Sequence, residues 1–407
     1  MHPTQALRQQ AAWAARKPRR NCNNFGNNLA AFPGLLKIGR MPLTTSSRRL
    51  AIATLFIAVC AHSAWAEGLK DLRSLKKTNH SPNAAAAQGP LYATRPEVMQ
   101  FADDLAARRD LDAQWVREAI GQSHYSATVQ RLMQPPAKTF QKNWRVYRSR
   151  FIDPVRIEAG ARFWRTHRET LERAEKEYGV SAEIIVGIIG VETIYGRDTG
   201  SFRVMDALTT LAFDFPASHP RARERSEFFK GEIEQFLTLQ SRRGVNPFDA
   251  RGSFAGAMGM PQFMPSSWVK YAVDFDGDGT IDLWNSPADV IGSVASYFRA
   301  FDWQPGMPTH YPVSFDKSRL DMDALMAPDI LPTFGIASFL DKGAVLEGQA
   351  LDHTGPLALI ELLNGPDAPQ YVAGTENFYA ITRYNWSSYY AMAVIELGRE
   401  VAARMRP

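Results

Sequence analysis

The sequence predicts an α+β fold that is predominantly α, with a helical N-terminal domain and a small β-rich insertion. Three observations predict it. Apolar residues recur every three or four positions over residues 95–178, residues 181–195 form one apolar helix, and short apolar runs stand among Gly, Pro and Asp between residues 306 and 374. A chain of 407 residues is too long for a single core, so we expect two or three domains.

The first 66 residues contain a predicted secretory signal. Arg48 and Arg49 precede an apolar run over residues 50–61, and Ala64-Trp65-Ala66 fits a cleavage site of the A-x-A type. The run is shorter than the ~20 residues that span a bilayer. We therefore expect cleavage after Ala66 and export to the periplasm. Residues 1–40 precede this signal and are either a disordered extension or the result of a start codon placed too early.

Both cysteines, Cys22 and Cys60, lie upstream of Ala66, so the mature chain would contain none. This excludes disulfides, thiol catalysis and thiolate metal sites. Lipidation of Cys60 is the alternative to soluble export and would associate the protein with the outer membrane. Val59 is bulky for the residue before a lipidated cysteine, which favours the soluble form. We expect a monomer.

The basic character of the chain belongs to its N-terminal segment. Of the 47 Lys and Arg and the 42 Asp and Glu, nine Lys or Arg and no acid fall within residues 1–66. The remainder holds 38 basic and 42 acidic side chains, a net charge of −4. The body of the protein therefore offers no electrostatic reason to bind nucleic acid.

The remaining chain divides by composition. Residues 67–94 read as a flexible leader, 95–180 as a helical domain, 181–305 as a core, 306–375 as a β-rich domain and 376–407 as a C-terminal segment ending in a helix. Further helices are predicted over 221–241, 265–273, 287–301 and 388–404, and Asp206 is interpreted as a helix cap. Strands are predicted over 344–346 and 357–362.

Glu192 ends the apolar helix that Ser181 is expected to cap. Because this helix is apolar almost all round, we expect it to be buried. Burial and the negative end of the helix dipole both favour a protonated carboxyl group, which a general acid needs near neutral pH. A structural glutamate paired with Arg197 or Arg203 is the alternative.

Four ordered motifs give the chain a family resemblance. Gly190-Val-Glu-Thr-Ile-Tyr-Gly-Arg197 resembles the catalytic segment of the membrane-bound lytic murein transglycosylase B family. Residues 252–267 resemble its substrate-cleft loop, 274–284 its calcium loop and 377–385 its C-terminal cleft segment. The resemblance covers roughly residues 95–405. It implies a lysozyme-like catalytic core over 181–305.

The resemblance also implies a function. A lytic transglycosylase cleaves the β-1,4 bond between N-acetylmuramic acid and N-acetylglucosamine in peptidoglycan glycan strands and leaves 1,6-anhydromuramyl ends. Glu192 would act alone, first as acid and then as base, with the substrate's N-acetyl group stabilising the anomeric carbon. The alternatives are a hydrolytic muramidase, which shares this fold and acid, and a non-catalytic peptidoglycan-binding module.

The resemblance assigns the substrate contacts residue by residue. They comprise polar groups, a phenylalanine and several tyrosines, whose rings can stack on the C–H faces of sugars. The expected set is Ser253, Gln262, Phe263, Tyr147, Tyr297, Tyr384, Asn385, Tyr390 and Arg225. Arg225 is the least settled, because residues 217–220 appear inserted nearby.

Asp274, Asp276 and Asp278 stand at positions 1, 3 and 5 of an EF-hand-like loop, and Thr280 would offer its carbonyl at position 7. Closely spaced carboxylates repel one another unless a cation intervenes, so the loop predicts a structural Ca²⁺ site. Position 12 is Asn285, which cannot supply a carboxylate. The resemblance assigns the last ligand to Asp289, for which the alternative is an acid in the first turn of a helix capped by Ser286.

Overall fold

The computed structural model describes residues 89–135 and 141–406. The predicted signal and most of the predicted leader lie outside these residues. The described chain is mostly helical with small antiparallel sheets, as the sequence predicts. Among the described residues, no helix is long and apolar enough to cross a membrane.

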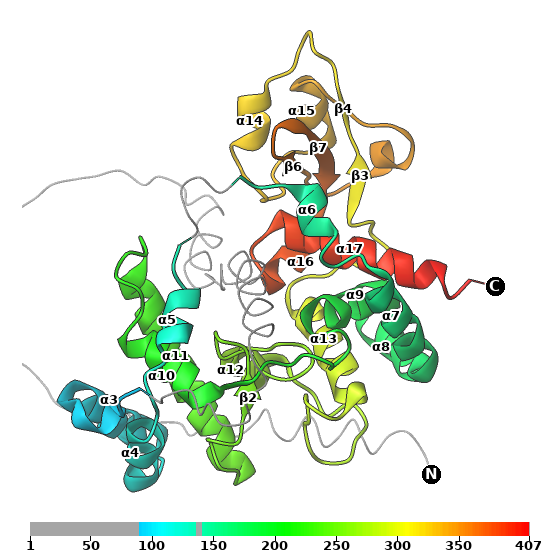
Figure 1. Cartoon of the computed structure of the whole chain (residues 1–407). Coiled ribbons are helices and arrows are strands. Elements are labelled where there is room, and N and C mark those ends of the chain that lie inside the picture. Colours follow the sequence, from blue (N-terminus) through cyan, green and yellow to red (C-terminus); the bar gives the residue numbers. More distant parts are fainter. Residues whose placement is uncertain (1–88, 136–140, 407) are drawn as a thin grey trace, which may run out of the picture. The chain divides into compact units, whose positions relative to one another are not determined.

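The first group of helices comes from both sides of α9 (Ala182–Thr193) in the sequence. A short 3₁₀ turn, η1 (Tyr92–Thr94), leads into α3 (Pro96–Arg109), α4 (Ala113–Gly121) and α5 (Ala127–Leu132), which pack with α10 (Val204–Phe213) and its neighbour α11 (Ala222–Arg243) (Figure 1). The side chains of Asp112 and Ser126 cap α4 and α5 by accepting hydrogen bonds from Trp115 N and Val129 N.

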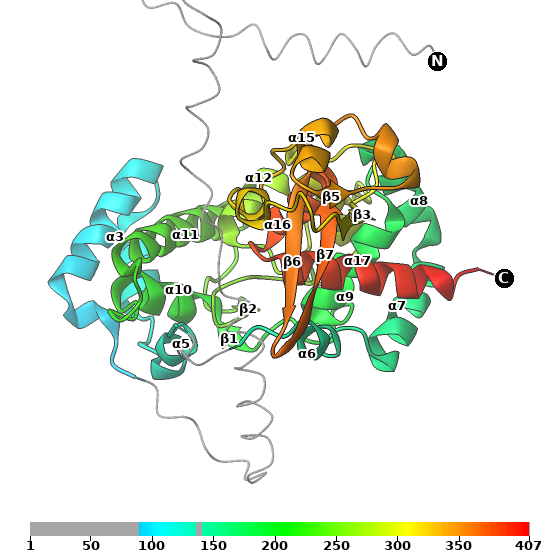
Figure 2. The same ribbon diagram turned by 90° about the horizontal axis from the view of Figure 1, so that it is seen from above.

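The second group surrounds α9 (Ala182–Thr193). The helices α6 (Trp144–Arg148), α7 (Pro154–Thr166), α8 (Arg168–Tyr178), α13 (Pro287–Ala300) and α17 (Ser388–Ala403) belong to it, and α9 packs most extensively on α17 (Figures 1 and 2). Every residue of α9 except Glu183 is buried, which confirms the predicted buried helix. The contacts of α7 and α8 with α9 therefore cross the predicted domain boundary at residue 180. The division into domains remains a prediction.

Two glycines allow α9 and α17 to approach closely. A Cβ at Gly187 would lie 2.3 Å from the carbonyl oxygen of Val394, and one at Gly398 would lie 2.2 Å from that of Glu183. Any side chain at either position would collide with backbone of the opposite helix. The C-terminal helix is thus held directly against the helix that carries Glu192.

The β-rich insertion has a small hydrophobic core of its own, which includes Leu325, Phe339 and Leu359. Its main sheet has the antiparallel order β3-β7-β6, from β3 (His310–Pro312), β6 (Ala358–Asn364) and β7 (Asp367–Gly374). Figure 2 shows the long β6–β7 hairpin. A second pair joins β4 (Ser314–Phe315) to β5 (Ala344–Val345), and α14 (Met322–Met326), α15 (Ile336–Asp341) and η2 (Gly348–Asp352) complete the unit.

The segment between α11 and α13 is mostly loop. Within it, β2 (Arg251–Gly252) pairs with β1 (Phe202–Arg203), which lies before α10, and α12 (Pro265–Tyr271) follows. The start of α12 is capped from outside, because the carboxylate of Glu232 on α11 accepts hydrogen bonds from Ser266 N at 2.8 Å and Ser266 Oγ at 2.6 Å. The last helix before α17 is α16 (Glu376–Tyr384).

The predicted cap at Asp206 is wrong, whereas the cap at Ser181 is confirmed in position only. Asp206 lies in the first turn of α10, not at its cap, and its carboxylate pairs with Arg203 and accepts from His124 N at 2.8 Å. Ser181 occupies the cap position of α9, but its side chain makes no capping hydrogen bond. The predicted helices and strands otherwise agree with the structure to within a few residues at each end.

Candidate active site

Glu192 lies in the last turn of α9, with 2% of its surface exposed. Its Oε1 accepts a hydrogen bond from the hydroxyl of Tyr390 at 2.5 Å. Tyr390 belongs to α17 and is itself fully buried. The close contact of α9 and α17 therefore brings together two polar groups that are 198 residues apart in sequence.

Three tyrosines lie in the electrostatic field of Glu192. Burial raises the pKa of the Tyr147, Tyr384 and Tyr390 hydroxyls far above the usual range, and the negative charge of Glu192 raises the pKa of each further. These hydroxyls stay protonated at physiological pH and can donate hydrogen bonds, as those of Tyr384 and Tyr390 do. The sequence predicted all three as site residues, and the structure places them around one carboxyl group.

An aromatic cluster continues from these tyrosines. The rings of Tyr384 and Tyr390 stack with centroids 6.3 Å apart, and Tyr384 lies 4.8 Å from Tyr297 and 5.8 Å from Phe263. The hydroxyl of Tyr384 donates to the carbonyl of Pro261 at 2.5 Å. Four of the predicted aromatic residues thus form one cluster beside Glu192, and the loop before α12 is joined to it through the carbonyl of Pro261.

The backbone turns sharply after Glu192. Ile194 and Tyr195 both adopt the left-handed region, with φ of 53° and 56°, which is unfavourable for a β-branched or bulky residue. Thr193 fixes this turn, because its hydroxyl donates to Met260 O at 2.8 Å and accepts from Gly196 N at 3.0 Å. Nothing in the local sequence predicts that Thr193 stabilises this turn, because a single threonine is equally common in other positions.

Ser253 and Gln262 are buried in the loop of residues 252–263. The side chain of each forms hydrogen bonds with backbone groups of this loop. Ser253 Oγ accepts from Ala255 N at 3.2 Å and Ala257 N at 3.0 Å. The Gln262 amide donates to Gly259 O at 2.9 Å and to Thr199 O at 3.1 Å. Both side chains therefore hold the shape of this loop beside the aromatic cluster.

Asn385 and Arg225 lie on different elements. Asn385 ends α16 directly after Tyr384; it is 2% exposed, and its Nδ2 is buried without a hydrogen-bond partner. Arg225 lies on α11 with its guanidinium 5.4 Å from the ring centre of Phe228 and 5.6 Å from that of Phe229. The first position suits a ligand contact next to the tyrosines, whereas the second ties Arg225 to aromatic packing.

The acidic loop brings three carboxylates together. Oxygens of Asp274, Asp276 and Asp289 all lie within 4.8 Å of one another. Asp278 is not among them; it accepts a hydrogen bond from Thr280 N at 2.7 Å. A hydrogen bond from Ser286 lowers the pKa of the Asp276 carboxyl, and burial raises that of Asp289.

Asp289 lies in the first turn of α13, as one of the two interpretations of the sequence expects, and its carboxylate lies beside those of Asp274 and Asp276. Its backbone N–H donates to Ser286 Oγ in the first turn of α13, at 3.2 Å. Its carboxylate, 1% exposed, accepts from Phe275 N at 2.7 Å and from Asp282 N at 2.8 Å, so it ties the two sides of the acidic loop to α13.

The three carboxylates fit a calcium ion. Calcium takes oxygen ligands at about 2.3–2.6 Å, so ligands on one ion can stand up to ~5 Å apart. The observed separation of 4.8 Å or less satisfies this limit, and the donor set is purely oxygen.

Comparisons with known proteins identify the family of this chain. The family model described as the transglycosylase SLT domain matches residues 93–399. Membrane-bound lytic murein transglycosylase B of Escherichia coli K12 is 40% identical over 326 residues, which cover 76% of this chain and 84% of that protein.

Two solved structures are similar throughout. Lytic transglycosylase SltB1 of Pseudomonas aeruginosa, in its catenated form, is 40% identical, with a TM-score of 0.69, over 77% of this chain and all of that one. The Escherichia coli lytic transglycosylase Slt35, solved in complex with calcium, is 39% identical, with a TM-score of 0.66, over 80% of this chain and 99% of that one. The fold is therefore that of the lysozyme-like lytic transglycosylases. The chain belongs to the transglycosylase SLT family and is a lytic murein transglycosylase.

Proposed function

We propose that Glu192 is the single acid/base catalyst that cleaves the bond between N-acetylmuramic acid and N-acetylglucosamine in peptidoglycan. The observation that carries this proposal is the burial of Glu192 at the end of α9 with the Tyr390 hydroxyl 2.5 Å from its Oε1. A buried carboxyl group held in one orientation by a hydrogen bond is suited to exchange a proton with a bound substrate. The hydroxyl of Tyr390 fixes its orientation.

In the first step Glu192 gives its proton to the glycosidic oxygen, and the bond from that oxygen to C1 of the muramyl residue breaks. The substrate's own acetamido oxygen stabilises C1. In the second step the muramyl C6 hydroxyl attacks C1, and its proton passes to Glu192, which restores the enzyme. No water is consumed, and the product carries a 1,6-anhydro ring.

This mechanism needs one carboxylate only. The acids that follow Glu192 in sequence are Asp198 and Asp206, and the carboxylate of Asp206 is already bound to Arg203 and to a backbone amide. A second carboxylate about 5 Å away would be required for a retaining hydrolase with a protein nucleophile. The engagement of Asp206 elsewhere supports the one-carboxylate route.

The proposed substrate contacts are the residues predicted from the sequence. Tyr147, Tyr297, Tyr384, Tyr390 and Phe263 form the aromatic surround, in which sugar rings can stack. Asn385 offers a buried donor, and Ser253, Gln262 and Arg225 complete the proposed set. A relative that is 29% identical, SltB3 of Pseudomonas aeruginosa, was solved in complex with NAG-NAM-pentapeptide, which supports glycan strands as the substrate.

The acidic loop is proposed to bind one Ca²⁺ with a structural role. Asp274, Asp276 and Asp289 would hold the ion, with Asp278 and the carbonyl of Thr280 as further ligands. The bound ion would neutralise the carboxylates and brace the loop before α13. The calcium complex of Slt35 supports this choice of metal.

The mature enzyme is proposed to work in the periplasm from an N-terminus at Glu67. The murein substrate and the signal-like segment over residues 41–66 support this. N-terminal sequencing of periplasmic material checks the proposal. A mature N-terminus at a lipidated Cys60 would instead identify a lipoprotein, in keeping with the name membrane-bound that the Escherichia coli relative carries.

The catalytic proposal is tested with Glu192→Gln. This variant should fold normally and lose nearly all turnover of purified sacculi, because general acid catalysis contributes ~10²–10⁴-fold. Glu183→Gln, in the first turn of the same helix, is the matched control and should keep full activity. Turnover above about a tenth of wild type in the Glu192 variant would refute the role. Mass analysis of the muropeptides gives anhydro ends for a transglycosylase and reducing ends for a muramidase.

A further inference from the structure

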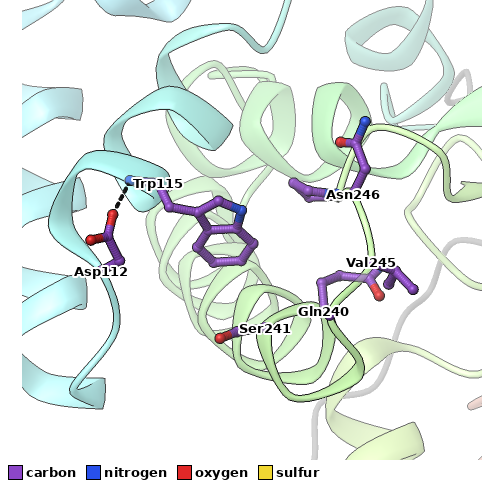
Figure 3. A pocket seen from close by; sticks show the side chains of 8 residues that line it. Asp112, Trp115, Gln240, Ser241, Val245 and Asn246 are labelled. Atoms are coloured by element: carbon purple, nitrogen blue, oxygen red, sulfur yellow. Dashed lines mark hydrogen bonds between the residues drawn. The ribbon is translucent and has the colours of Figure 1, made fainter.

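A pocket lies between the start of α4 and the end of α11, apart from the candidate active site (Figure 3). Its volume is about 460 Å³, within the ~300–1,000 Å³ of small-molecule sites. The residues that matter for its chemistry are Asp112, Trp115, Gln240, Ser241, Val245 and Asn246. None of them belongs to the candidate active site or to the acidic loop.

Trp115 provides an aromatic surface in this pocket. The indole is only partly buried, and it extends from α4 toward the end of α11 and the turn that carries Asn246 (Figure 3). The carboxylate of Asp112 accepts a hydrogen bond from Trp115 N at 2.6 Å and so fixes the backbone from which the indole extends. An aromatic face held in this way suits stacking on the C–H face of a sugar ring.

Gln240 provides an unsatisfied polar group. The side chain is 2% exposed, and its Oε1 is buried without a hydrogen-bond partner. A buried acceptor that accepts no hydrogen bond costs free energy, and a ligand with an N–H or O–H donor would recover it. Asn246 Oδ1 accepts from Phe248 N at 3.0 Å, so the side-chain NH₂ of Asn246 is the group that can donate to a ligand.

The charge of the pocket selects the class of ligand. Its lining contains one acid, Asp112, and no Lys, Arg or His. A phosphate or carboxylate would find no cation here and would be repelled by the acid. The pocket therefore fits a neutral ligand that offers an apolar ring face together with hydroxyl and amide groups.

We propose that the Trp115 pocket is a second glycan-binding site that takes a neutral N-acetylhexosamine unit. The proposal rests on the proposed function, because every second unit of the peptidoglycan strand is a neutral N-acetylglucosamine. A unit held on Trp115 keeps the enzyme on a strand while another segment of glycan reacts at Glu192.

The site is tested by ¹⁹F NMR of the full chain labelled with 5-fluorotryptophan and titrated with N-acetylglucosamine. Trp115→Phe identifies the Trp115 signal, and Trp164, which lies on α7, serves as the internal reference. We expect the Trp115 signal to move saturably with N-acetylglucosamine and not with inorganic phosphate. Gln240→Leu should weaken this binding about tenfold, and its melting temperature checks that it folds. A stationary Trp115 signal, or an equal response to phosphate, overturns the proposal.

A second measurement connects the pocket to the polymer. In the Glu192→Gln background, Trp115→Ala should reduce retention on sacculi several-fold, whereas Trp164→Ala should not; equal retention in both would overturn the role on the strand. The titration is independent of catalysis, because N-acetylglucosamine has no glycosidic bond to cleave. An active Glu192→Gln enzyme would thus refute the proposed function and leave the titration of Trp115 unaffected. A stationary Trp115 signal would refute the second site and leave the role of Glu192 unaffected.

Discussion

Replacing Asp289 by alanine should destabilise the protein even in the absence of calcium. The Asp289 carboxylate is 1% exposed and accepts hydrogen bonds from two backbone amides, those of Phe275 and Asp282. Alanine leaves both N–H groups without this acceptor. An unsatisfied buried donor costs about 1–3 kcal/mol. This cost applies to Phe275 N, whereas Asp282 N is only partly buried, so the free energy of unfolding should fall by at least about 1–3 kcal/mol. Folded proteins have only about 5–15 kcal/mol in total.

Urea unfolding in EDTA measures this loss, and two further variants interpret it. Asp289→Asn keeps one carbonyl oxygen as acceptor and should lose about half as much. Asp274→Ala removes an exposed carboxylate bonded to Gly277 N and Gly279 N and should lose less than either. All three should also lose most of the stabilisation by calcium, ~2.7 kcal/mol at a hundredfold excess over Kd in the wild type. An Asp289→Ala protein as stable in EDTA as the wild type would refute the reasoning.

The remaining predictions concern buried groups in the scaffold. Burial raises the pKa of the Glu232 carboxyl above its usual value of 4.5. The folded protein therefore binds this proton more tightly than the unfolded chain does. The protonated Glu232 thus contributes most to the free energy of unfolding below pH 4.5, and this contribution declines as the pH rises above that value. Glu232→Gln should remove that decline, and an unchanged pH dependence of urea unfolding would contradict it. Gly187→Ala should destabilise by about 1–3 kcal/mol or prevent folding, because its Cβ meets the Val394 carbonyl. Gly231→Ala, on α11 with open space around it, should stabilise by about 0.4–1 kcal/mol; thermal melts that rank the two glycine variants the other way would disprove the packing argument.

The sequence predicts the regular elements well where a local pattern determines them. The apolar run before Glu192 predicts α9, and Ser286-Pro287 predicts the start of α13, because both signals lie within a few residues of the structure they specify. The two predicted strands of the β-rich unit correspond to β5 and to the start of β6 for the same reason.

The candidate site is predicted less completely, because its contacts join distant segments. The resemblance named Tyr390, but nothing in the local sequence shows that its hydroxyl reaches Glu192. The local sequence does not show that Glu232 caps the start of α12, since this acceptor lies 34 residues earlier on another helix. Trp115 had no signal either, as a single tryptophan in an amphipathic helix reads as ordinary core. Tertiary packing decides all three.

The contact between α9 and α17 has a consequence for when this enzyme can become active. Glu192 lies near the middle of the 407-residue chain, whereas Tyr390, whose hydroxyl donates to it, belongs to the last helix described. A chain that stops before α17 lacks that hydroxyl, as well as the helix against which Gly187 packs. Under the proposed mechanism, copies that end before α17 should therefore be inert rather than weakly lytic. Because this enzyme cleaves cell-wall glycan, a requirement for the complete fold through α17 would protect the cell from lysis by incomplete copies.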